Sequence, residues 1–167
     1  MKKDIENAVV ALLMKNIVLL NGKVDGEMVM RVYKCLAMLE ARNSPDIEIR
    51  IFTNGGNVRA GLDIYDALRR YKGKKTGVVY AYARSMGAII LQACEERVCL
   101  KHASVLIHHI NTQSISLDAI EDPERFAKLR ESMWTDQKAL YAILAKRTGK
   151  GEDEIRETCK KDQDMSA

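Results

Sequence analysis

The sequence lacks any apolar run that approaches the ~18 residues needed to span a bilayer. It also lacks a recognisable export signal. Two acidic residues closely follow the lysines at positions 2 and 3, and Lys15 and Asn16 interrupt the apolar stretch that comes next. We therefore expect a protein without a membrane partner.

The four cysteines, Cys35, Cys94, Cys99 and Cys159, lack the spacing of a metal site, so we expect no bound metal. Cys94 and Cys99 fall in apolar segments, as core cysteines do. Reduced thiols without an export signal indicate a cytoplasmic protein.

Signals for nucleic-acid or phosphate binding are also scarce. The net charge is only +4, and the 27 basic and 23 acidic residues are interspersed along the chain. The lysine pairs at 2–3, 74–75 and 160–161 have no aromatic platform between them, which argues against a nucleic-acid partner. Neither Gly-x-Gly-x-x-Gly nor Gly-Lys-Ser/Thr occurs, so we expect no phosphate loop and no cofactor.

Strand and helix patterns alternate along all 167 residues, which predicts one α/β domain over 1–167 with mostly parallel strand pairing. Asp25 is a suitable cap for the first helix. The predicted strands are 17–20, 47–52, 76–83, 98–100 and 104–107. The predicted helices are 26–41, 57–71, 88–96, 120–147 and 152–160.

Ser85 lies between a β-rich apolar run and an apolar helix, in the pattern Ala-x-Ser-x-Gly. A serine at such a corner exposes its hydroxyl and faces the positive end of a helix dipole, which suits a nucleophile. The alternative is a serine that only caps the helix. Hydrolases with a nucleophile elbow have the motif Gly-x-Ser-x-Gly, and this sequence has its second glycine but alanine in place of the first.

A base and an acid for Ser85 can be proposed from the same chain. His108 ends the strand predicted over 104–107, and His109 points to the opposite face of an extended chain. Asp162, with Asp164 as a rival, is the candidate acid. Both residues also have a simpler structural explanation. His108 would be a histidine at the rim of the core, and Asp162 would lie in an exposed polar tail.

Gly55 and Gly56 follow the second predicted strand, where two glycines let a backbone N–H turn outward. Gly55 and the N–H of Met86 are the expected donors to an oxyanion.

The order of these motifs resembles the ClpP serine peptidases, the proteolytic subunits of the Clp protease. The resemblance runs from about Leu13 to the last residue. It is carried by the segment 54–66 with its Gly-Gly-x-x-x-Ala-Gly core, Ser85-Met86-Gly87-Ala88, the run 105–108 that ends in His108, and the segment 162–167.

The resemblance implies a Ser85–His108–Asp162 triad with Gly55 and Met86 holding the oxyanion. It implies a ClpP/crotonase-like spiral of strand-strand-helix units with a protruding handle helix near 120–147. It further implies heptameric rings stacked as a tetradecamer, fed with unfolded polypeptide by an AAA+ unfoldase that alone uses ATP.

The chain departs from the family at several positions. Asn54 stands where the family usually has proline, and Arg84 replaces a small residue. No glycine follows His108 in the segment expected to pair with substrate. The chain stops where the family continues, which predicts either a truncated sequence or a poorly fixed Asp162. The positions expected to contact substrate are Gly56, Arg84, His109 and Ile110.

Two other functions fit parts of this pattern. A non-catalytic ring subunit would explain Arg84 and the altered segment after His108. A crotonase-type enzyme acting on acyl-CoA thioesters would use the oxyanion site without a triad. A Ser–Lys dyad is disfavoured, because no lysine occupies a strand edge comparable to that of His108.

Overall fold

A computed structural model describes residues 2–111, 115–162 and 164–166. The chain divides into two compact units. The first comprises Met1–Ile107 and Asp164–Ala167, and the second comprises His108–Gln163. The prediction that 1–167 acts as a single domain stays a prediction.

The first unit is built on a mainly parallel sheet. Its path is β1-β2-β3-β5-β6, and β4 also pairs with β3. All pairings are parallel except that of β5 with β6. The strands are β1 (Ile17–Asn21), β2 (Ile47–Thr53), β3 (Lys75–Arg84), β4 (Glu96–Cys99), β5 (Ser104–Leu106) and β6 (Asp164–Ser166).

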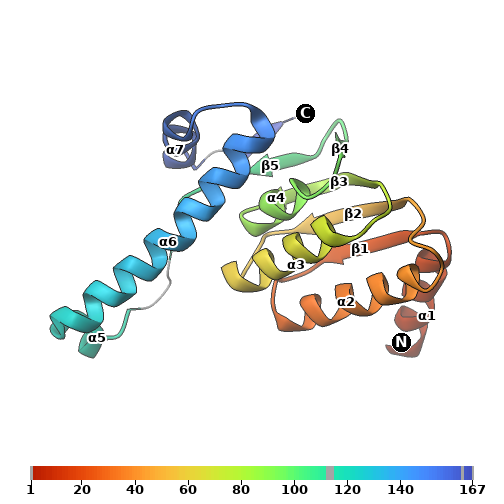
Figure 1. The fold of residues 1–167 in the computed structure, drawn as a ribbon, viewed down its shortest axis with the longest axis horizontal. Helices are drawn as coiled ribbons and strands as arrows, with labels where there is room; N and C mark the ends of the chain where they lie inside the picture. Colours follow the sequence, from red (N-terminus) through yellow and green to blue (C-terminus); the bar gives the residue numbers. More distant parts are fainter. Residues whose placement is uncertain (1, 112–114, 163, 167) are drawn as a thin grey trace. The chain divides into compact units, whose positions relative to one another are not determined.

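Helices cover one face of this sheet. Figure 1 shows α2 (Gly26–Glu40), α3 (Val58–Arg70) and α4 (Met86–Leu91) in front of β1, β2 and β3, and α1 (Lys2–Met14) precedes β1. Ile49 and Ile51 of β2, Ile64 of α3 and Ile90 of α4 are fully buried. The predicted α/β fold is confirmed, because the apolar sides of helices and strands meet in one core.

The helix starts follow their local sequence signals. The side chain of Asp25 accepts a hydrogen bond from the N–H of Met28 at 3.1 Å, so the predicted cap is confirmed. Asn57 caps α3 in the same way, accepting from the N–H of Ala60 at 2.9 Å.

The second unit contains α5 (Leu117–Glu121), α6 (Pro123–Thr148) and α7 (Glu152–Lys160). The helix predicted over 120–147 is wrong at its start, because α5 and α6 are separate. The backbone of Asp122 is extended, and its side chain accepts from the N–H groups of Glu124 and Arg125. Pro123 takes the first helical position, where its missing N–H costs nothing.

Two further expectations need correction. The helix predicted over 88–96 ends at Leu91, and the strand predicted over 98–100 begins at Glu96, which pairs with Thr76. The segment after Asp162 is not wholly a polar tail, because Asp164–Ser166 forms β6. Within the described residues, no helix has both the length and the apolar character needed to cross a bilayer.

Lys75, at the start of β3, is a buried cation with a full set of partners. Its side chain is 4% exposed, and its Nζ donates to the carbonyls of Tyr71 at 3.0 Å and Gly73 at 2.9 Å. A carboxylate oxygen of Glu95 lies 3.3 Å from the same Nζ. Lys75 thus connects the start of β3 with the end of α3 and with the loop between them.

We predict that Lys75→Met lowers the free energy of unfolding by about 1–3 kcal/mol, because it leaves buried carbonyl acceptors without a donor. Denaturant titration measures the change. Lys74→Met is the matched control, since Lys74 is half exposed and bonded to Glu96 on the surface. Equal stability of the two variants would contradict this role of Lys75.

Candidate active site

Ser85 lies at the corner between β3 and α4 in a strained backbone conformation. Its φ is 53° and its ψ is −121°, a region that side-chain-bearing residues rarely adopt. Its side chain makes no capping hydrogen bond, and its N–H donates to the Leu106 carbonyl at 2.9 Å. The helix-cap alternative therefore has no support, and the corner has the strained geometry that a nucleophile elbow requires.

The Gly55 backbone packs directly on this corner. A Cβ atom added at Gly55 would lie 2.7 Å from the Cβ of Ser85, 2.8 Å from the Arg84 carbonyl oxygen and 3.0 Å from the Met86 nitrogen. The φ of Gly55 is 91°, which also favours glycine. The parallel pairing of β2 with β3 brings both strand ends to one edge.

The N–H groups around Ser85 differ in what they bind. The Gly55 N–H donates to the Thr53 hydroxyl at 3.0 Å, so it does not support the expected role of Gly55 as an oxyanion donor. Among the described residues, no hydrogen-bond acceptor is found for the N–H groups of Met86 and Gly56. These two N–H groups belong to the residues that follow Gly55 and Ser85, and they remain available as donors.

Arg84, expected to contact substrate, is bound to another part of the same unit. Its guanidinium donates to both carboxylate oxygens of Asp164, at 3.0 and 2.7 Å. These bonds hold the pKa of the Asp164 carboxyl below its usual range, and the Ser104 hydroxyl lowers it further. Asp164, the rival acid, is thus engaged by Arg84 and Ser104.

His108 and Asp162 belong to the second unit, so their place beside Ser85 stays a prediction. His108 follows β5 and is partly buried. Asp162 is exposed, and its φ of 46° is left-handed.

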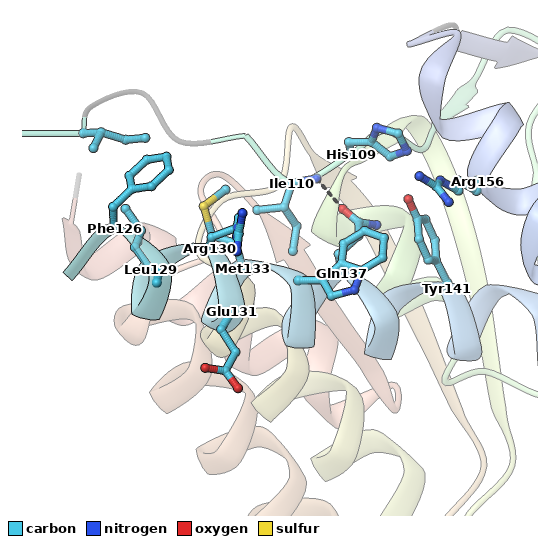
Figure 2. Close-up of a pocket in the computed structure, with 13 residues that line it drawn as sticks. His109, Ile110, Phe126, Leu129, Arg130, Glu131, Met133, Gln137, Tyr141 and Arg156 are labelled. Atoms are coloured by element: carbon cyan, nitrogen blue, oxygen red, sulfur yellow. Dashed lines mark hydrogen bonds between the residues drawn. The ribbon is translucent and has the colours of Figure 1, made fainter. Parts of the chain in front are cut away.

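The segment after His108 turns towards α6 (Figure 2). The His109 ring meets the Tyr141 ring edge to face, with centroids 6.0 Å apart. The Ile110 N–H donates to Oε1 of Gln137 at 2.6 Å. An incoming peptide that paired with Ile110 at this N–H would have to replace Gln137.

A cavity of about 820 Å³ lies beside this segment within the second unit. Phe126, Leu129, Met133 and Trp134 of α6 form its apolar wall, and Arg156 of α7 lies near its polar end with Tyr141 (Figure 2). Its size is in the range of small-molecule sites.

Three of the four cysteines are weak nucleophiles at neutral pH. Burial raises the pKa of the Cys159 thiol to about 11 and also raises the pKa values of Cys35 and Cys99. These groups stay protonated, and the thiolate is the nucleophilic form. The described residues contain no cluster of three or more His, Cys, Asp or Glu side chains that could hold a metal ion.

Sequence reasoning missed two residues that shape this region. Thr53 binds the Gly55 N–H, and Gln137 binds the Ile110 N–H. The sequence offered a weak signal for Gln137, a polar residue on the inward side of a long helix, where it is 5% exposed. It offered none for Thr53, because a strand-end threonine is common.

We predict that Gly55→Ala displaces the Ser85 corner, because the added methyl group would collide with the Ser85 Cβ and the Arg84 carbonyl. Gly22→Ala is the matched control, since Gly22 has a φ of 88° but no atom near its missing Cβ. Gly55→Ala should lose about 1–3 kcal/mol more stability than Gly22→Ala in denaturant titration. Similar losses would show that the collision is relieved at little cost.

Two comparisons with known proteins agree. The sequence model of the Clp protease family matches residues 2–167. The chain is 33% identical over 154 residues to the ATP-dependent Clp protease proteolytic subunit 3, chloroplastic, of Arabidopsis thaliana. That match covers 90% of this chain and 48% of the relative, so the chain spans about half the relative's length. Together with the α/β fold, these matches show that the chain belongs to the Clp protease family.

Proposed function

We propose that this chain is a serine endopeptidase of the Clp type that cleaves unfolded polypeptides. The observation that carries the proposal is the strained Ser85 corner, with the Gly55 backbone packed against it and unoccupied N–H groups beside it. A hydroxyl held at such a corner is exposed to a substrate carbonyl. Membership of the Clp protease family supports peptide hydrolysis as the type of reaction.

The proposed chemistry follows triad logic. His108 takes the hydroxyl proton as the Oγ of Ser85 attacks the scissile carbonyl, and Asp162 fixes the tautomer of the imidazole. The tetrahedral intermediate collapses when the imidazolium gives that proton to the leaving amine. Water then attacks the acyl-enzyme by the same route, releasing the acid product and restoring Ser85.

The oxyanion of the intermediate needs donors that are not already bonded. We assign this role to the N–H groups of Met86 and Gly56, since the Gly55 N–H is held by Thr53. Gly55 instead supplies the close packing that a side chain would prevent. No cofactor enters this scheme.

The proposed assembly is a heptameric ring, stacked as a tetradecamer and fed by an AAA+ unfoldase in the cytoplasm. Its support within this chain is α6, which is 26 residues long. Its first half is largely exposed, including the apolar side chains of Phe126 at 40% and Trp134 at 44%, and contact with another copy would bury them.

A second candidate is a non-catalytic ring subunit. The bond from the Ile110 N–H to Gln137 favours it, because that bond occupies a backbone group expected to pair with substrate. In this case the assembled protein would take up no serine-directed probe.

We predict that a fluorophosphonate probe adds once per chain to the purified protein, and that Ser85→Ala abolishes the addition. Intact mass spectrometry measures the adduct. Ser44→Ala is the matched control, because Ser44 also has a left-handed φ, 49° against 53° for Ser85. Labelling that survives in Ser85→Ala would exclude this serine as the nucleophile. An unlabelled wild-type protein in assembled rings would favour the non-catalytic subunit.

We also predict that the labelling rate falls as the pH is lowered from about 8 to about 5, because a protonated imidazole cannot accept the Ser85 proton. Rates measured across this range should show an acid limb. His108→Gln should label slowly at every pH and show no such limb. A wild-type rate that is independent of pH would contradict the role of His108.

A further inference from the structure

An ion pair crosses three strands beside the nucleophile. The strand register places Arg84 of β3 opposite Leu106 of β5, and Leu106 opposite Asp164 of β6. Residues that lie opposite one another in a sheet point to the same face. The side chains of Arg84 and Asp164 therefore meet over β5.

The geometry of this pair is specific. Nε and Nη2 of Arg84 donate to the two carboxylate oxygens of Asp164, at 3.0 and 2.7 Å, in a bidentate arrangement. The Ser104 hydroxyl donates to the same carboxylate at 3.1 Å. The guanidinium also lies over the Tyr82 ring, with its central carbon 5.0 Å from the ring centroid.

The strand that this pair holds has little else to fix it. β6 has three residues, all of them exposed, and Met165 is 39% exposed. Its backbone pairs with β5 over only three positions. Among the described residues of β6, Asp164 alone supplies side-chain hydrogen bonds. A short edge strand without apolar burial depends on such a contact.

Exposed ion pairs usually add little to stability, and these side chains are 37% and 40% exposed. The contribution of this pair is instead geometric, because a planar guanidinium that donates two parallel hydrogen bonds to one carboxylate holds it in a defined orientation. It fixes where the chain lies, whatever it adds to the free energy of unfolding.

We infer that Arg84 and Asp164 are positioning residues: their ion pair anchors the chain next to Asp162 to the strand that leads to Ser85. This inference rests on the proposed function. Arg84 directly precedes Ser85, and Asp162 comes two residues before Asp164. Two residues span at most about 7 Å, so anchoring Asp164 confines Asp162 to a small volume. The pair links the nucleophile's strand to the acid's segment.

The pair persists over the neutral pH range. Because its bonds to Arg84 lower the pKa of Asp164, the carboxylate stays charged above that value and is lost only in acid. The anchor is therefore constant over the pH range in which the labelling of Ser85 is measured.

The test compares Asp164→Asn, which keeps the shape and removes the charge, with Asp164→Glu, which keeps the charge. Glu96→Gln is the matched control, because it removes the charge from an exposed pair with Lys74 at the opposite end of β3. Two readouts are taken on the purified full chain: hydrogen exchange of the amides in β5 and β6, and the rate of fluorophosphonate labelling at Ser85.

We expect Asp164→Asn to exchange faster in β6 and to label up to about a hundredfold more slowly, the order of loss that a misplaced catalytic group can cause. Asp164→Glu should recover most of the rate, and Glu96→Gln should match the wild-type protein. Simple loss of folded protein would lower the labelled amount without slowing the labelling of the molecules that remain folded.

Three results would overturn the inference alone: unchanged exchange in Asp164→Asn, wild-type labelling in that variant, or the same slow labelling in Asp164→Glu as in Asp164→Asn. A wild-type chain that takes up no probe overturns the proposed function, and this role with it. The hydrogen-exchange result still reports whether Asp164 anchors β6, so the two failures are distinguishable.

Discussion

The contact between the Gly55 backbone and the Ser85 corner is the constraint on which the site depends. It needs a glycine in a left-handed conformation after β2, a strained serine after β3, and parallel pairing that ends both strands at one edge. The packing of α3 and α4 against one another places Gly61 against Met86, where a Cβ would lie 2.4 Å from the Met86 Cε. Gly61 thus permits the close packing of α3 on α4, as Gly55 permits the close contact with the Ser85 corner.

The core elements were predictable because their signals are local. The periodic apolar patterns of α2 and α3 and the alternation in β2 can be read from a few neighbouring residues, and the structure agrees to within two residues. The helix end at Leu91 was not predictable in this way. All six residues of α4 are buried, and the buried run continues through Cys94 without a periodicity that would mark the end of the helix.

Other features were not predictable because they depend on distant partners. β6 exists through pairing with β5 and through Arg84, which lies 80 positions away from Asp164. Glycines after β2 correctly indicated a close approach to Ser85, but the choice between their N–H groups depends on the orientation of the Thr53 hydroxyl. Likewise, Gln137 and Ile110 are 27 positions apart, and the residues next to Ile110 give no signal for the hydrogen bond between them.

The separation of 80 positions between Arg84 and Asp164 also has a kinetic consequence. Closing a long loop carries an entropic cost, so contacts between near neighbours form first and β6 should dock late in folding. The strands β1, β2 and β3 lead to the Ser85 corner and need no residue beyond 107 for their own pairing. A newly made chain would thus form the Ser85 corner first and pair Asp164 with Arg84 only after β6 has joined the sheet.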